Sequence, residues 1–192
     1  LEFLTPTGET PVADQLRTAI SRYVGVHLIA FGTGAPEADH ARLAQAGYDP
    51  LPPVALQRPI STEAGEATAR FTVVRVPPGR MAEGRIQFCH HHTPELLWQP
   101  RWLAHPNGAM ALSTLLVCVT EPREAAQRYS RFTGIDCSGE GNEWRLETAR
   151  GRVIFARADA FERLLGFGPP ALPWIAGYVL ETRDFSRTAR AV

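Results

Sequence analysis

Lysine is absent from this chain, because all 20 basic residues are arginine. This absence excludes a P-loop lysine, a Schiff-base lysine and a lysine general base. Since arginine does not lose its proton in proteins, proton transfer must fall to histidine, tyrosine, cysteine, a carboxylate or metal-bound water.

Net charge, cysteine and long apolar runs are also scarce. The 20 arginines are balanced by 20 acidic residues, so nothing indicates a nucleic-acid groove or a membrane-surface patch. No apolar run approaches the roughly 18 residues of a membrane span, and no signal peptide opens the chain. The 3 cysteines are too few and too scattered for a disulfide framework or a cysteine-based zinc site. We therefore expect a cytoplasmic protein without nucleic-acid or membrane partners.

Histidine and tryptophan are concentrated between Arg85 and Ala109. Polar and apolar residues alternate from Arg85 to Cys89, which predicts a strand with one buried face. The alternation places Ile86, Phe88, His90 and His92 on one face, and Gln87, Cys89 and His91 on the other. Imidazoles at the end of a strand can ligate a metal, and a polar strand end in water is the alternative.

One pattern occurs three times along the chain: a strand, a threonine and a helix beginning with proline or an acidic residue. Gly-x-Asp follows the helix in the first two copies, and the chain leaves the third helix unfinished. Val26–Thr33 and Ser113–Thr120 begin the first two copies, and Tyr178–Thr182 begins a third. Further strands follow the first two helices, which gives βαβββ units near Val24–His92 and Ser113–Ala158. The sequence therefore predicts an α+β protein whose repeated βαβββ modules form curled mixed sheets with helices outside.

The repeat also bears on His27, which interrupts an apolar strand. Its counterparts in the other two copies are Thr114 and Ala176, so the fold does not require an imidazole there. A buried histidine bonded to a carbonyl and a metal ligand are both open interpretations.

The repeat, together with GRIQFCHHHTPELLW at Gly84–Trp98 and HPNGA at His105–Ala109, resembles the glyoxalase-like branch of the vicinal oxygen chelate superfamily. The superfamily includes glyoxalase I, bleomycin-resistance proteins and extradiol dioxygenases. The resemblance covers nearly the whole chain, and it implies modules that pair around a divalent metal. It divides the chain into residues 1–110, a module pair with an incomplete leading module, and 111–192, a degenerate pair with an incomplete trailing module.

The resemblance also implies a ligand set for the metal. Glu2 maps to the last strand of the leading module, His27 to the first strand of the next, and His90 to its last strand, with His92 one pleat further. Such a mixed N/O set would suit zinc, nickel, manganese or iron. Two departures weaken the match. The first strand of the leading module is not in this chain, and the ligand position that His90 occupies is more often a glutamate in the superfamily.

The implied function is a metal-dependent enzyme of lyase or isomerase type, which acts on a small oxygen-rich substrate through a metal-stabilised enediolate. Glu2 or Glu95 would be the catalytic base, and Arg85, Arg101 and Trp98 would bind the substrate. The alternative for Glu95 is a turn cap, and for the arginines a solvated surface.

Two other functions are open. A non-catalytic binding protein of the bleomycin-resistance type would hold a flat ligand against Phe88, Trp98 and Trp102. A ring-cleaving dioxygenase would place Glu2, His27 and His90 on one iron. In each case the partner is a small molecule. We also expect the strand at Glu2 and the helix beginning at Phe185 to lean on missing segments, a partner chain or both, which leaves a homodimer open.

Overall fold

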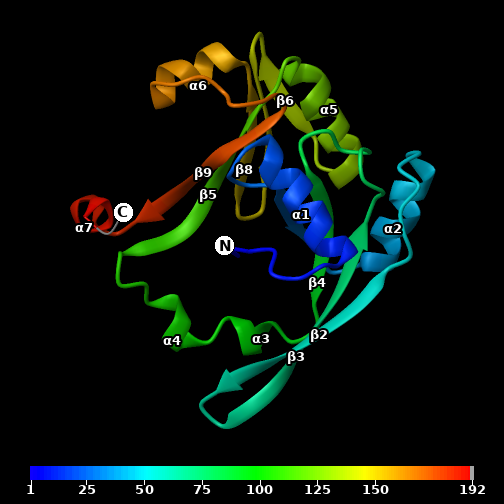
Figure 1. Ribbon diagram of the computed structural model, residues 1–192, viewed down its shortest axis with the longest axis vertical. Coiled ribbons are helices and arrows are strands. Elements are labelled where there is room, and N and C mark those ends of the chain that lie inside the picture. Colours follow the sequence, from blue (N-terminus) through cyan, green and yellow to red (C-terminus); the bar gives the residue numbers. More distant parts are fainter. Residues whose placement is uncertain (191–192) are drawn as a thin grey trace.

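The computed structural model describes residues 1–190, which form an α+β fold with two mixed sheets (Figure 1). The first sheet has the strand order β1-β4-β3-β2. Its elements follow the chain as β1 (Leu28–Gly32), α2 (Pro36–Gln45), β2 (Val54–Thr62), β3 (Gly65–Arg75) and β4 (Arg85–His91). This is one βαβββ module, as the sequence predicts.

The second sheet has the order β6-β7-β8-β5-β9. Its elements are β5 (Ala109–Cys118), α5 (Pro122–Thr133), β6 (Cys137–Glu140), β7 (Glu143–Thr148), β8 (Gly151–Ala156) and, after α6 (Ala158–Leu165), β9 (Trp174–Thr182). In each module the first strand lies parallel to the last: β1 to β4, and β5 to β8. The predicted repeat is therefore confirmed.

The third copy of the pattern also appears, since β9 leads into α7 (Phe185–Ala189). β9 pairs antiparallel with β5.

Helix α1 (Pro11–Arg22) follows its N-cap residue Thr10, whose side chain accepts a hydrogen bond from the Ala13 N–H at 3.2 Å. None of the described helices is long and apolar enough to cross a membrane.

Two local expectations need correction. Two prolines and an Asn-Gly pair predict an ordered loop from Trp98 to Ala109, but this segment contains α4 (Pro100–Leu103), which follows α3 (Pro94–Leu97). We call the segment between β4 and β5, residues 92–108, the linker. Each short helix begins with a proline, whose fixed φ suits a first helical turn. Leu1–Leu4, expected to be a strand, has none in the structure, and within the described residues it pairs with no other strand, so no ladder fixes it.

The main hydrophobic core lies between the sheets and the helices α2 and α5. It draws on both modules, including Leu43 of α2, Phe88 of β4, Phe132 of α5 and Phe155 of β8. The rings of Phe88 and Phe132 stack with centroids 5.3 Å apart. The Tyr48 hydroxyl donates to the carbonyl of Arg128 on α5 at 2.7 Å. One face of both sheets is therefore covered by helices, as Figure 1 shows on the right-hand side.

The two sheets meet at a narrow seam. A single isolated bridge joins Val26, just before β1, to Ile175 of β9. Tyr23 reinforces it: its hydroxyl donates to the Val26 carbonyl at 2.9 Å and accepts from the Ile175 N–H at 3.3 Å. Tyr23 also belongs to a second core cluster, with Phe161 and Trp174.

Candidate functional site

The alternation of β4 separates its side chains as predicted, but the apolar side turns toward the helices. Ile86 and Phe88 are buried in the core beneath α2 and α5, which places His90 and His92 on the helix side of the strand. Arg85, Gln87, Cys89 and His91 face the other way and are all partly exposed. We call this second side of the first sheet the open face.

His90 and His92 lie together at the end of β4. Their ring centroids are 4.5 Å apart. The Nδ1 atom of His90 is 2.8 Å from the carbonyl oxygen of Thr33, in the loop that leads to α2. The Nε2 atom of His92 is 2.8 Å from the Thr72 hydroxyl. One nitrogen of each ring is thus already engaged by the protein.

His27 lies at the opposite end of the paired strands. Leu28 is opposite Arg85 in the parallel register, so His27 is level with Gly84, and His90 lies roughly 20 Å further along at about 3.3 Å per residue. Ligands of one zinc ion lie only about 2.0–2.1 Å from it. His27 and His90 are therefore not placed to share an ion, and this corrects the convergence expected from the sequence.

A hydrogen bond and a ring contact fix the orientation of the His27 imidazole. Its Nε2 atom is 2.8 Å from the Tyr23 carbonyl oxygen, and the two rings lie 4.2 Å apart between centroids. Both interpretations of His27, the buried structural one and the metal ligand, anticipate a bond to a carbonyl. The contact thus explains how the ring is oriented and leaves both interpretations open.

The remaining predicted site residues are dispersed. Glu2 is exposed on the N-terminal segment, and Glu95 is exposed in the first turn of α3. Arg101 donates to the Gln99 side chain at 3.0 Å and to the Ser61 carbonyl, which ties the linker to the β2–β3 hairpin. Trp98 is 52% exposed, with the Arg150 guanidinium 5.5 Å from its ring centroid.

A divalent metal therefore does not fit the predicted ligand set. Of Glu2, His27, His90 and His92, only the last two lie together. Across residues 1–190, no group of three or more histidine, cysteine or carboxylate side chains is arranged to hold a metal ion.

The open face has a strong positive charge instead. By strand parity and register it carries Arg58 of β2, Arg75 of β3 and Arg85 of β4. Among the described strand positions of this face, none is an aspartate or a glutamate. None of the three arginines takes part in an ion pair with any described residue.

Arg75, Arg85 and Gln87 form a compact group on this face. Arg75 is directly opposite Gln87, whose side-chain oxygen accepts a hydrogen bond from Arg85 Nε at 3.1 Å. The Nε of Arg75 is buried and has no hydrogen-bond partner within the described part of the chain. Burial lowers the pKa of Arg85, and the charge of Arg75 lowers it further. The group therefore holds concentrated positive charge and an unused donor.

His91 lies further along the same face, edge-on to Phe71 with ring centroids 5.1 Å apart. Burial lowers its pKa, and the charges of His90, Arg150 and Arg58 lower it further. The imidazole is thus held neutral at neutral pH, where it can accept or relay a proton.

Sequence reasoning missed Arg58, Arg75, Gln87 and His91 as site residues. The prediction placed the site on the side of β4 that carries its apolar residues, because ligands often project from an apolar strand. The sequence signal that identifies the open face is the alternating set of polar residues, Arg85-x-Gln87-x-Cys89-x-His91. When helices cover one face of a sheet, the apolar side chains of each strand point toward the helices and the polar side chains point toward the other face.

The comparisons agree with this fold. No curated protein matches the chain. Among solved structures it is similar to a hypothetical protein from Staphylococcus aureus, with a TM-score of 0.59 and 11% identity, over 76% of this chain. The chain spans 57% of the length of that protein. This likeness supports the fold alone.

A family model supplies the classification. The model described as "Glyoxalase-like domain" matches residues 1–133, which include the first βαβββ module, the linker and the beginning of the second. The match agrees with the resemblance inferred from the GRIQFCHHHTPELLW and HPNGA segments. The chain belongs to the glyoxalase-like domain family, within the vicinal oxygen chelate superfamily.

Proposed function

We propose that this chain belongs to an enzyme of lyase or isomerase type, which holds a small, anionic, oxygen-rich substrate on the open face of the first sheet. One observation carries the proposal: Arg75 and Arg85 lie together on a face whose described strand positions include no carboxylate.

The electrostatics of the group favour an anion. Diagonal neighbours on adjacent strands are about 7–8 Å apart, a span that two long guanidinium side chains can close around one ligand. Guanidinium groups bind carboxylates and phosphates through paired hydrogen bonds. An anion between Arg75 and Arg85 would satisfy the buried Nε of Arg75 and offset the repulsion that lowers the pKa of Arg85.

The same group suits the chemistry implied by the family. An enediolate carries its negative charge on vicinal oxygens, and fixed cationic donors stabilise charge that develops in a transition state. Gln87, held by Arg85 Nε, supplies an amide beside them. The proposed metal donors do not fit one ion, so no step of the reaction is assigned to a metal here.

The non-catalytic binding protein remains the second candidate, because the same arginines would sequester an acid without transforming it. The dioxygenase alternative needs Glu2, His27 and His90 on one iron, and the distance between the two histidines counts against it.

Binding is tested by calorimetry with malonate and with malonamide, its neutral analogue. We expect malonate to bind at least about tenfold more tightly, and Arg75→Gln and Arg85→Gln each to remove most of that preference. Arg17→Gln, in the exposed Arg17–Asp14 pair of α1, is the matched control and should change nothing. Equal binding of malonate and malonamide would refute the anion site.

Catalysis is tested by exchange of the α-protons of dihydroxyacetone phosphate and 3-hydroxypyruvate in deuterated water, followed by NMR. An enzyme that forms an enediolate accelerates this exchange, and Arg85→Gln should slow it. If the protons exchange only at the rate seen in buffer while anion binding is intact, the enzyme proposal fails and the non-catalytic binding protein is the function that stands. Metal analysis of the parent protein beside His27→Ala and His90→Ala tests the ligand roles separately.

A further inference from the structure

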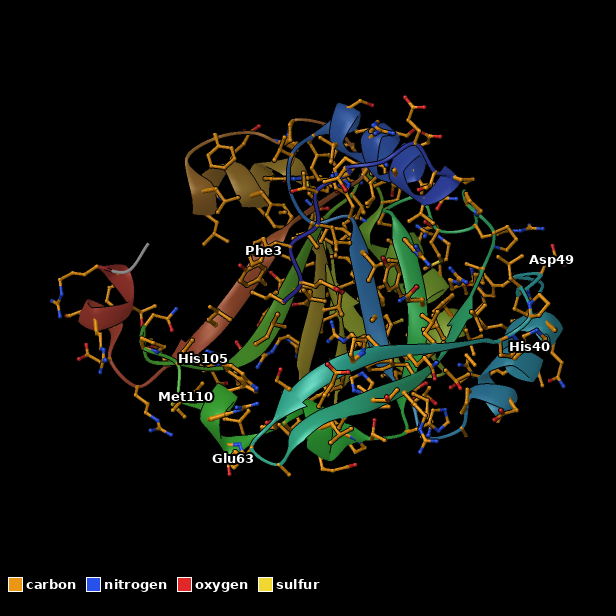
Figure 2. The ribbon with its side chains drawn as sticks, turned by 60° about the horizontal axis from the view of Figure 1, so that its bottom comes forward. Phe3, His40, Asp49, Glu63, His105 and Met110 are labelled. Atoms are coloured by element: carbon orange, nitrogen blue, oxygen red, sulfur yellow. The ribbon has the colours of Figure 1, made fainter. Side chains whose placement is uncertain are left out.

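A hollow of about 610 Å³ lies outside the group of Arg75 and Arg85, neither of which lines it. Its walls are the linker from α3 to β5 and the junction of β9 with α7. Figure 2 labels His105 and Met110, both in its lining, where the linker enters β5 near α7. The side chains that decide its chemistry are Trp98, Leu103, His105, Met110, Arg183 and Arg187.

Hydrogen bonds fix the two walls to each other. The Gly108 carbonyl accepts from the Arg183 N–H and from the Thr182 hydroxyl, both at 3.1 Å. The Thr188 hydroxyl donates to the Asn107 carbonyl at 2.7 Å. Gly108 has φ of +82°, and a Cβ there would lie 3.3 Å from the Thr182 hydroxyl oxygen. The Asn-Gly turn thus docks tightly on β9–α7, and the hollow is preformed.

The linker wall is apolar and exposed. Trp98 is 52% exposed, Leu103 50% and Met110 54%. Large apolar side chains that gather in a concave surface are typical of a ligand-binding pocket, because a ligand removes them from water together. The Arg150 guanidinium lies over the Trp98 ring, 5.5 Å from its centroid, and the rest of the exposed indole offers a flat surface for a ring or an alkyl chain.

The opposite wall is cationic. Arg183 and Arg187 form no ion pair with any residue from 1 to 190. Asp184 also lines the hollow, and its carboxylate accepts a hydrogen bond from the Arg187 backbone N–H at 2.9 Å as the cap of α7. Two guanidinium groups and one carboxylate leave this wall with a positive excess.

We propose that this hollow binds a small amphipathic anion, with a flat apolar body against Trp98, Leu103 and Met110 and one anionic head group toward Arg183 and Arg187. The site is separate from the group of Arg75 and Arg85 and does not depend on the proposed reaction. Arg85 lies toward the beginning of β4, roughly 20 Å along the strand from His91 at its end, and the linker with Trp98 follows that end.

The test uses 2-naphthoate as the probe and 2-naphthalenemethanol as its neutral analogue, with tryptophan fluorescence as the readout. We expect 2-naphthoate to quench saturably and to bind about tenfold more tightly than the alcohol. Trp98→Phe should remove most of the quenching, because Trp98 lines the hollow. The double variant Arg183→Gln/Arg187→Gln should bind the two probes equally.

Two further variants locate the binding. Arg163→Gln, an exposed arginine on α6, and Arg17→Gln, an exposed arginine on α1, should both leave the quenching by naphthoate unchanged. Equal affinity of the parent for the two probes would overturn the proposal. So would quenching that persists in Trp98→Phe, a charge preference that survives the double variant, or a loss of quenching in Arg17→Gln or Arg163→Gln.

Discussion

Glu83 and Arg128 form a bidentate ion pair that joins the turn before β4 to α5. The Arg128 Nη1 and Nη2 atoms donate to the two carboxylate oxygens of Glu83 at 2.8 and 2.7 Å. Glu83 is only 1% exposed. Burial alone would lower the pKa of Arg128, but its hydrogen bonds to Glu83 and Glu124 raise it. The first module is thereby tied to the helix of the second through a buried charge.

Removing one member of this pair should destabilise the protein strongly. Arg128→Met leaves the Glu83 carboxylate buried without its cation, and we expect the free energy of unfolding to fall by about 3–5 kcal/mol. Urea denaturation measures the loss. The double variant Glu83→Leu/Arg128→Met should recover much of it, whereas Arg163→Met, in an exposed pair, should cost less than about 1 kcal/mol. Equal losses in the single and double variants would contradict this account.

The pKa of His91 should respond to the arginines of the open face. Since the charge of Arg58 lowers that pKa, Arg58→Gln should raise it, and the imidazole would then protonate at higher pH. NMR titration of the His91 ring protons checks the direction. Arg123→Gln, an arginine that lies over Trp144, is the control and should leave the His91 titration unchanged.

Gly84 should not tolerate a side chain. A Cβ there would lie 2.6 Å from the His27 carbonyl oxygen, the acceptor of the Arg85 N–H at 2.9 Å. Gly84→Ala must therefore push β1 away from β4, at a cost of about 1–3 kcal/mol by analogy with overpacked cores. Gly8→Ala, where nothing lies within 4 Å, is the matched control for thermal unfolding. Similar melting temperatures for the two variants would rule out the tight contact.

Cys118 should resist alkylation in the folded protein. Its side chain is fully buried, and burial raises its pKa from 9.0 to about 11, so little reactive thiolate forms at pH 8. Iodoacetamide at pH 8, followed by peptide mass spectrometry, should label Cys118 only after unfolding in urea. Because the folded pKa is the higher one, this thiol favours the folded state fully below pH 9 and loses that contribution as the pH rises toward 11. Labelling of native Cys118 at the unfolded rate would contradict the burial.

The fold was predictable because its signals are local. Threonine before a proline-led helix and glycine after it recur at Thr33–Gly47 and Thr120–Gly134, and both units form the expected βαβββ module. The linker was harder to predict, because Pro94 and Pro100 are compatible with both a loop and a short helix.

The candidate site was only half predictable, for a physical reason. Alternation correctly separates His90 and His92 from His91, since side-chain direction follows from the pleat. Which side the helices cover depends on packing between modules, such as the stacking of Phe88 on Phe132. The separation of His27 from His90 follows from the parallel register of β1 and β4, which no local pattern specifies.

The way in which Tyr23 joins the two sheets has a consequence for the contact between them. Strands within each sheet are held by continuous ladders, whereas the two sheets share one bridge, Val26 to Ile175, and the two hydrogen bonds of a single phenol. The modules are also joined by the Glu83–Arg128 ion pair and by the shared core, but between the sheets themselves the loss of the Tyr23 hydroxyl would remove both of these side-chain hydrogen bonds at once. His27 bonds to the Tyr23 backbone and packs on its ring, so this histidine helps to hold the phenol in place where the two sheets meet.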